Sequence, residues 1–194
     1  MEQPIEKKYT YADYLALGEK IRAELIDGEL HMMSPSPSRK HQYTAGKLYW
    51  QIEDFLRDKP CEVYIAPFDV RLFEKDNNSD DETDTVVQPD ISVICDKSKL
   101  DDRGCKGAPD LIIEILSPSS ISHDRFVKLN LYQQAKVREY WIVSPFERSV
   151  EVLLLDEDGK FTHAGAYSKD EKAKVNVLPG CEIDLSKVFP EEEN

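Results

Sequence analysis

The sequence predicts one α/β domain of three layers, with a mixed β-sheet between helices. Three observations support this prediction. The chain has 194 residues and 40% of them are hydrophobic, which is enough to bury one full core. Helix-like and strand-like segments follow each other as helix, hairpin, helix, strands, helix and strands, which is typical of a sheet covered by helices. No repeat or flexible linker divides residues 1–194, so we expect a single domain.

The N-terminal part carries signals for two helices and a hairpin. Residues 10–21 have the apolar spacing of a short helix, and Thr10 is a suitable N-cap. The pair Asp27-Gly28 lies between two apolar-rich runs and predicts the turn of a hairpin. After a loop rich in proline and serine, the periodicity of residues 39–57 predicts an amphipathic helix.

Strands dominate the rest of the chain. The run LIIEIL at 111–116 is apolar on both faces, which is typical of a strand in the middle of a sheet. A helix is expected from Ser120 or Ser122 to about Lys136. Further strands are expected at 62–66, 68–73, 86–94, 139–144 and 149–155, with several short ones within 160–185 and a polar loop at 95–108.

The chain is strongly acidic. Its net charge of −13 argues against broad, non-specific binding to nucleic acid, because neutralising phosphates requires lysine and arginine. A local basic cleft is still compatible with this charge. The stretch 76–84 holds five acidic residues and no basic one, which predicts a solvated loop.

The cysteines and the apolar runs indicate in which cellular compartment the protein is expected. Four cysteines are scattered without a CxxC pair, so we expect neither a zinc site nor a disulfide framework. No apolar run approaches the ~20 residues of a membrane span, and the N-terminus lacks the apolar stretch of a signal peptide. These features predict a cytoplasmic protein with no membrane partner.

Glu114 stands out because it interrupts an otherwise apolar strand. Burying a carboxylate costs several kcal/mol unless it is paired, bound to metal or protonated. Three alternatives stay open at this point: an ion pair with a buried arginine or lysine, a position at the end of the sheet that reaches solvent, or a metal ligand in a cleft.

Two Pro-Asp pairs offer a second carboxylate. Asp110 shares a strand face with Glu114, but four steps along a strand place the two Cα atoms roughly 13 Å apart. That separation is hard to bridge by one Mg²⁺ or Ca²⁺ ion, so Asp110 is expected to mark the mouth of the strand. Asp90 begins another strand, and adjacent strands are only ~4.8 Å apart. Asp90 and Glu114 are therefore the better pair for one ion.

The following helix adds a third charged group. Asp124, Lys128 and Tyr132 are spaced i, i+4 and i+8 and therefore lie on one helix face. Either Asp124 and Lys128 form an ordinary helix ion pair, or Lys128 points over the sheet toward Glu114. In the second case, Lys128 would stabilise charge or help to activate a water molecule.

These residues lie in a longer string that resembles a known family. The string "QPDISVI…GAPDLIIEILSPSS…DRFVKLNLYQQAKVREYWIVSP", with "AELIDGELHMMSPSPSRKHQ" before it, resembles the restriction endonuclease family labelled Uma-two. That family belongs to the PD-(D/E)XK superfamily of nucleases. The resemblance covers the chain from about Tyr11 to Leu155. The Pro-Asp and glutamate pair alone is a weak signal, whereas the whole ordered string is specific.

The resemblance implies a fold, an activity and a site. The fold is a restriction-endonuclease-like three-layer core with a mixed central sheet flanked by helices, here with extra C-terminal strands. The activity is Mg²⁺-dependent (or Mn²⁺-dependent) hydrolysis of DNA phosphodiester bonds, with Asp90 and Glu114 as metal ligands. The general pattern places a lysine two residues after the acid, where this chain has Leu116. The resemblance implies that Lys128, from the following helix, takes that role.

For four further residues, the sequence gives weaker reasons to place them at the site. Glu24 matches an acidic residue of the family and either joins the metal shell or lies on the hairpin surface. Tyr132 either touches the site or packs in the core, and packing is preferred. His41 is expected to cap or pack its helix. Asp69 is expected to face solvent or to pair with Arg71.

Three functions remain open from the sequence. The first is a metal-dependent DNA endonuclease. The second is a catalytically weak or inactive relative that binds nucleic acid or protein, which the net charge and Leu116 favour. The third is a nuclease-like fold acting on another phosphoester or nucleotide. A homodimer is compatible with each of them, but nothing in the sequence requires one.

Overall fold

The computed structural model describes residues 7–18, 21–33, 36–73, 79–80, 82–117 and 123–191, apart from the side chains of residues 123–125. Its central layer is a mixed six-stranded sheet in the order β12-β11-β10-β9-β6-β3. Only β9 and β10 run parallel, and all other pairs are antiparallel. The strands are β3 (Glu62–Ile65), β6 (Ile91–Ile94), β9 (Leu111–Ile115), β10 (Glu139–Ser144), β11 (Ser149–Leu155) and β12 (Phe161–Ser168).

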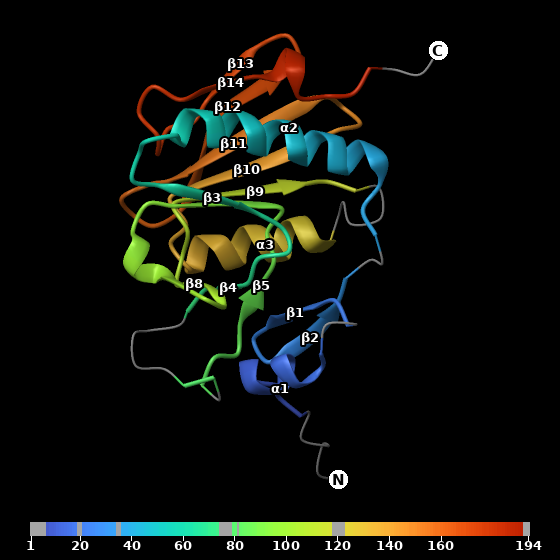
Figure 1. Ribbon diagram of the computed structural model, residues 1–194, viewed down its shortest axis with the longest axis vertical. Helices are drawn as coiled ribbons and strands as arrows, with labels where there is room; N and C mark the ends of the chain where they lie inside the picture. Colours follow the sequence, from blue (N-terminus) through green and yellow to red (C-terminus); the bar gives the residue numbers. More distant parts are fainter. Residues whose placement is uncertain are drawn as a thin grey trace.

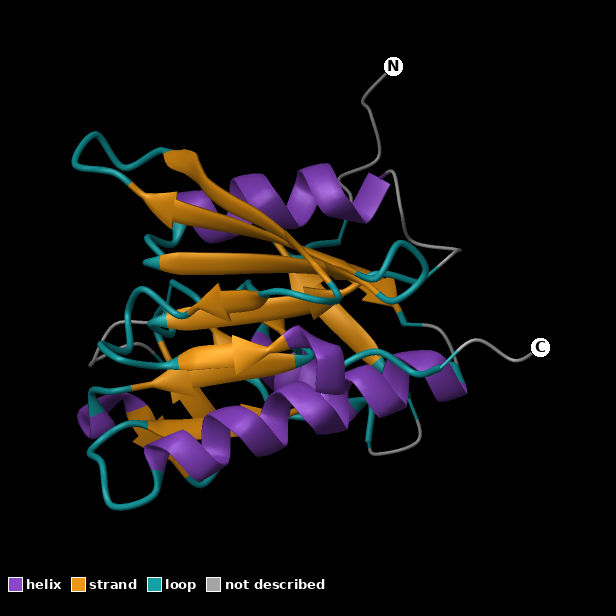
Figure 2. Cartoon of the chain, turned by 90° about the horizontal axis from the view of Figure 1, so that it is seen from above, coloured by secondary structure: helices purple, strands orange, loops and turns teal. Residues whose placement is uncertain are grey.

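One long helix covers each face of this sheet (Figure 2). Helix α2 (Arg39–Leu56) buries an apolar stripe that includes Leu48 and Ile52 against the side chains of Ile91 and Ile113. Helix α3 (His123–Gln134) packs on the opposite face, beside Ile112. The predicted three layers are therefore confirmed, with the strand that carries Glu114 in the middle of the sheet.

A second six-stranded sheet lies beyond α3 and was not predicted (Figure 1). Its order is β2-β1-β5-β4-β8-β7. Its strands are short, and two of them lie within residues 95–108, which were expected to form a loop. The bounds are β1 (Ala23–Ile26), β2 (Glu29–Met32), β4 (Val70–Arg71), β5 (Val86–Val87), β7 (Leu100–Asp101) and β8 (Gly104–Lys106).

Two prolines explain how the chain moves between the sheets. The segments 62–73 and 86–94 each pass from one sheet to the other, with a break at Pro67 and at Pro89. A proline has no N–H to give to a strand ladder, so it favours such a break. The expected continuous strand 86–94 is therefore wrong: Val86–Val87 belongs to the second sheet and Ile91–Ile94 to the central one. Residues 88–90 form the corner between them.

The N-terminal elements follow their local signals. Helix α1 (Tyr11–Ala16) begins after the predicted cap Thr10 and is shorter than the expected 10–21. The hairpin β1–β2 turns at Asp27 and Gly28, which have φ values of 51° and 79°. Positive φ at both positions is what a two-residue hairpin turn of this type requires.

The C-terminal strands extend the core. β10 and β11 form the predicted hairpin, and the short strands β13 (Lys172–Lys174) and β14 (Glu182–Asp184) form a separate pair. Short 3-10 helices occur at Lys97–Lys99 and Leu185–Lys187. The expected caps Ser120 and Ser122 lie outside the described residues, as do residues 76–78 and 81 of the acidic stretch.

The cysteine prediction is wrong for one pair. Cys61 and Cys95 form a disulfide, although they are 34 residues apart in sequence. They flank the paired residues Glu62 and Ile94 of β3 and β6, so the sheet places them opposite each other. This pairing arises from strand register, which the spacing of cysteines along the chain does not reveal. Among the described helices, none is long and apolar enough to cross a membrane.

Candidate active site

Glu114 is held by two side chains of α3. Its carboxylate oxygen Oε1 lies 2.8 Å from Lys128 Nζ and accepts a 2.5 Å hydrogen bond from the hydroxyl of Tyr132. The side chain of Glu114 shares its sheet face with Ile112 and is only 13% exposed. Of the alternatives for Glu114, the structure thus shows an ion pair with a buried lysine, and that lysine is the one expected at the site.

Lys128 joins the two sheets. Its ammonium also lies 2.9 Å from Oε1 of Glu24, a residue of β1 in the second sheet. Because α3 lies between the sheets, one side chain can reach a carboxylate on each. The expectation that Lys128 points toward Glu114 agrees with this geometry, whereas a role as an ordinary surface lysine does not.

Glu24 is buried rather than placed on the surface of the hairpin. It is 7% exposed, and the backbone N–H of Gln88 donates to its Oε1 over 2.9 Å. That N–H is available because Gln88 lies at the corner where the chain leaves β5. Glu24 therefore belongs to the same polar cluster as Glu114 and Lys128.

Asp90 lies next to Glu114 across the sheet. The antiparallel register pairs Ile91 with Ile113, so Asp90 is opposite Glu114 one step further along. The backbone N–H of Ile115 donates to Asp90 Oδ2 over 2.7 Å, which fixes the carboxylate. The register thus makes Asp90 and Glu114 neighbours across the two strands, and the charge of Asp90 acts on Glu114.

His41 is a member of the cluster that the sequence did not identify. Its Nε2 lies 3.2 Å from Asp90 Oδ2, while its backbone N–H donates to Oγ of Ser38, which is the N-cap of α2. His41 therefore does not cap the helix itself; it packs as expected, and its ring has a second role beside Asp90. These two residues are 49 positions apart, so no local pattern could have linked them.

Charge and burial shift the titration of the central groups. Burial raises the pKa of Glu114 to about 7; the nearby Asp90 and Glu24 add to this rise, and Lys128 opposes it. Burial disfavours the charged form of Lys128, but the charges of Glu114 and Glu24 outweigh it and raise the lysine pKa. For His41, likewise, the carboxylate of Asp90 outweighs burial and raises the pKa.

Comparison with known proteins identifies the family. Residues 10–186 match the Uma2 family, which is described as "Putative restriction endonuclease". The chain belongs to the Uma2 family. It is also 25% identical to the Synechocystis sp. (strain PCC 6803) protein slr1290 over 92% of this chain and 90% of that protein, and 27% identical to sll1609 of the same organism over 75% and 80%.

A solved structure supports the fold. A crystal structure from Anabaena variabilis ATCC 29413, described as a "putative nuclease belonging to DUF820", superimposes with a TM-score of 0.69. The alignment covers 93% of this chain and 97% of that chain at 20% identity. The restriction-endonuclease-like mixed α/β fold expected for a Uma2 protein is therefore confirmed, together with its extra C-terminal strands.

Three other residues of this Uma2 chain were assigned roles from sequence. Tyr132 does both things that were considered: it is fully buried in the core, and its hydroxyl contacts Glu114. Leu116 is half-buried and packs against the core beside α3, where the general pattern places a lysine. The side chain of Asp124 lies outside the described residues, so its pairing with Lys128 stays a prediction.

Asp69 differs from its expected role. It accepts hydrogen bonds from the hydroxyls of Tyr11 (3.1 Å) and Tyr14 (3.3 Å) and from Nε2 of Gln88 (2.9 Å). It therefore does not simply face solvent, and Arg71 instead donates to Asp101 over 2.6 Å. Because the backbone of Gln88 holds Glu24, Asp69 helps to fix the corner that positions this carboxylate.

Asp110 lies away from the cluster, as predicted. Its Oδ2 accepts a 2.8 Å hydrogen bond from the backbone N–H of Cys95, and its Oδ1 lies 2.8 Å from Nη1 of Arg138. Asp110 thus ties the start of β9 to neighbouring segments. The conspicuous Pro109-Asp110 pair has a structural role here.

The cluster has the chemistry of a divalent cation site. In the described part of the chain, every hydrogen bond and ion pair of Glu24, Asp90 and Glu114 goes to one oxygen of each carboxylate, which leaves three carboxylate oxygens without a partner. Oxygen donors of this kind suit Mg²⁺ and Mn²⁺. Among the described residues, no three His, Cys, Asp or Glu side chains already converge on one point, and the ammonium of Lys128 contacts both Glu24 and Glu114.

Proposed function

We propose that this protein is a divalent-metal-dependent endonuclease that hydrolyses phosphodiester bonds of DNA. Asp90 and Glu114 hold the metal ion, Glu24 adds a third carboxylate, and Lys128 replaces the lysine of the general motif. The family description and the nuclease-like fold support the reaction class. The site itself supports the choice of residues.

One observation carries the proposal: two carboxylates, those of Glu24 and Glu114, share the ammonium of Lys128 in a nearly buried cluster, and a third, Asp90, lies next to Glu114 across the strands. The side chains of Glu24, Glu114 and Lys128 are only 8%, 13% and 15% exposed. Repulsion between carboxylates in such a place is costly, and a divalent cation would relieve it. The unpartnered oxygens provide ligands for that cation.

Each residue has a defined task in this proposal. A bound Mg²⁺ or Mn²⁺ ion would polarise the phosphate and lower the pKa of its water ligand. Asp90 is kept in place by the N–H of Ile115, and Glu114 by Tyr132. Lys128 supplies a fixed positive charge that stabilises negative charge developing on the phosphate. Because Lys128 is only 15% exposed and contacts two carboxylates, it is more rigid than a surface lysine would be.

A cleavage assay tests the proposal. We expect nicking of plasmid DNA, or cutting of single-stranded DNA, with Mg²⁺ or Mn²⁺ and none with a chelator. Glu114→Gln and Lys128→Met should each reduce the rate by at least ~100-fold. The exposed ion pair Glu62–Lys97 (2.7 Å) provides the matched control, because Glu62→Gln and Lys97→Met should leave the rate unchanged. Equal cleavage by wild type and both site variants would contradict the proposal.

A second candidate function is a nuclease-fold protein that binds without cutting. It is favoured by the contacts of Lys128, which already neutralise part of the charge of Glu24 and Glu114. This candidate predicts DNA or protein binding with no metal-dependent cleavage, and no change in thermal stability on addition of Mg²⁺. The two functions thus differ in both measurements.

A further inference from the structure

The first part of α2 is the most basic stretch near the proposed site. Residues 39–50 contain Arg39, Lys40 and Lys47 but no aspartate or glutamate, and the first acidic residue of the helix is Glu53. All three basic side chains are exposed. In a chain with a net charge of −13, this half of the helix provides a local positive surface.

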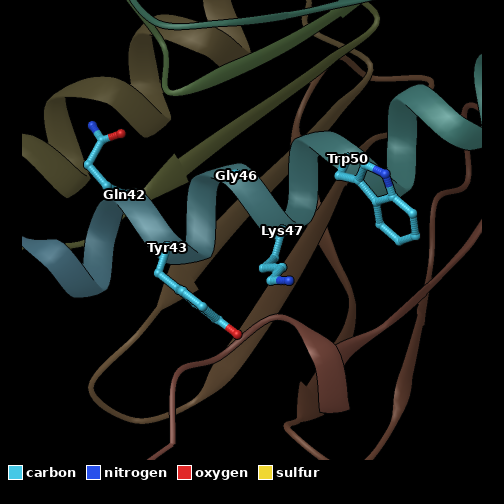
Figure 3. A pocket seen from close by; sticks show the side chains of 5 residues that line it. All are labelled: Gln42, Tyr43, Gly46, Lys47 and Trp50. Atoms are coloured by element: carbon cyan, nitrogen blue, oxygen red, sulfur yellow. The ribbon is translucent and has the colours of Figure 1, made fainter.

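Aromatic rings alternate with this positive charge. Trp50 is 59% exposed and Tyr43 is 41% exposed, although such large side chains are usually well buried. The ammonium of Lys47 lies 5.4 Å from the centre of the Tyr43 ring. Figure 3 shows these side chains projecting from neighbouring turns of α2.

Gly46 opens a hollow between the two rings. The hollow is lined by Gln42, Tyr43, Gly46, Lys47 and Trp50. A Cβ atom at Gly46 would have no neighbour within 4 Å, so neither packing nor a positive φ requires glycine here. Glycine inside a helix lowers its stability. A residue that destabilises the helix but leaves an open space between exposed aromatic rings is consistent with a binding surface.

This surface lies on the same helix as one residue of the candidate active site. His41, in the first turn of α2, contacts Asp90. At a rise of 1.5 Å per residue, Trp50 lies about 14 Å further along the helix axis. About four nucleotides at the spacing of one DNA strand cover that distance. With 3.6 residues per turn, Trp50 lies on the side of α2 opposite His41, so a nucleic-acid strand bound at Trp50 reaches the cluster by passing around the start of the helix.

We propose that Tyr43, Gly46, Lys47 and Trp50 form a docking surface for single-stranded nucleic acid on the exposed side of the helix that carries His41. This inference rests on the proposed nuclease function. Proteins that bind single strands combine basic grooves with exposed aromatic rings on which bases stack. The lack of acidic residues on this half of the helix favours a polyanion over an acidic or neutral peptide. The bases stack on Trp50 and Tyr43, and Lys47 contacts the backbone phosphates.

Binding of a fluorescein-labelled oligo-dT tests the docking surface in a chelator, where no metal-dependent cleavage occurs. Fluorescence anisotropy should show about tenfold weaker binding for Trp50→Ala and for Tyr43→Ala, and near wild-type binding for Trp50→Phe. Lys47→Ala should reduce the slope of log K against log salt by about 0.7. Phe146→Ala, at an 87% exposed aromatic residue elsewhere, and Lys160→Ala are the matched controls.

Tryptophan fluorescence provides a second readout. The chain has two tryptophans, and Trp141 is fully buried, so quenching by the oligonucleotide should come from Trp50. Quenching that persists in Trp50→Phe would overturn the inference. Equal oligonucleotide binding by the Trp50, Tyr43 and control variants would also overturn it. The same holds if Trp50→Ala loses self-association but binds the oligonucleotide as wild type does.

The same variants separate this inference from the proposed function. If wild type cuts DNA but the α2 variants bind and cut as wild type does, the docking surface is wrong and the nuclease function stands. If the oligonucleotide binds through Trp50 and Tyr43 but neither DNA form is cut, the docking surface stands and the proposed function is wrong. Glu114→Gln should bind the oligonucleotide as wild type does in either case.

Discussion

The carboxylate of Glu114 is stabilised by the ammonium of Lys128 and the hydroxyl of Tyr132. The carboxylate interrupts an apolar strand, and its burial is offset by Lys128 and Tyr132. Such an arrangement is sensitive to the loss of one partner, because the remaining charge is left buried. The stability of the folded chain therefore depends on both partners of Glu114 being present.

Removing Lys128 should therefore weaken the fold. For Lys128→Met, we expect the free energy of unfolding to fall by about 3–5 kcal/mol near neutral pH, since Glu24 and Glu114 lose their shared partner. Urea denaturation measures this change. The double variant Glu114→Gln/Lys128→Met should recover part of the loss, because of the two partners of Lys128 only Glu24 then remains charged. A Lys128→Met protein as stable as wild type would contradict the ion-pair geometry.

The sequence identified some of these residues and not others. Glu114 was identified because a charge in an apolar strand is unusual, and Asp90 because adjacent strands bring residues together. Lys128 was named from the family resemblance, and the helix face it occupies made the contact reasonable. His41 and Asp69 were considered but given other roles, because their partners lie on elements whose relative placement follows only from the complete fold.

At the scale of elements, local signals gave the helices and hairpins but not the division between sheets. The cap at Thr10, the turn at Asp27-Gly28 and the length of α2 all follow from neighbouring residues. The passage of residues 86–94 from one sheet to the other depends on which strands lie beside them. The corner at residues 88–90, which positions Glu24 and Asp90, is thus a tertiary property.

Helix α2 allows a test of the open hollow at Gly46. We expect Gly46→Ala to raise the free energy of unfolding by about 0.5–1 kcal/mol, because alanine favours a helix and its methyl group meets no other atom. Thermal or urea denaturation checks this expectation. Ala45→Gly, at a buried position of the same helix, should lower stability instead. A destabilised Gly46→Ala protein would show that the space at this position is filled.

At the scale of the whole molecule, metal binding and folding should be coupled. An ion that binds only the folded chain stabilises it by about 2.7 kcal/mol at a hundredfold excess over its dissociation constant. The folded state without metal holds a proton on Glu114 up to about pH 7, whereas a glutamate ordinarily loses it near 4.5. A metal ion must displace that proton, so its affinity should increase as the pH rises through 7.

We therefore expect Mn²⁺ to raise the melting temperature more at about pH 8 than at about pH 6. Without metal, the pH dependence has the opposite sign. The folded state binds the proton of Glu114 more tightly than the unfolded state does, because burial raises the pKa of this group. The contribution of Glu114 to the free energy of unfolding therefore falls as the pH rises from 4.5 to 7. Differential scanning calorimetry with and without metal separates the two effects. A metal-induced increase that is equal at both pH values, or equal in Glu114→Gln, would place the ion elsewhere.

The central claim is that the corner between the two sheets holds a divalent cation. An anomalous difference map from crystals grown with Mn²⁺ tests it most directly. We predict a peak within coordination distance of carboxylate oxygens of both Asp90 and Glu114, and no such peak in crystals of the Glu114→Gln protein. A map with no peak there in the wild-type protein, or with manganese bound only at other carboxylates, would contradict the account.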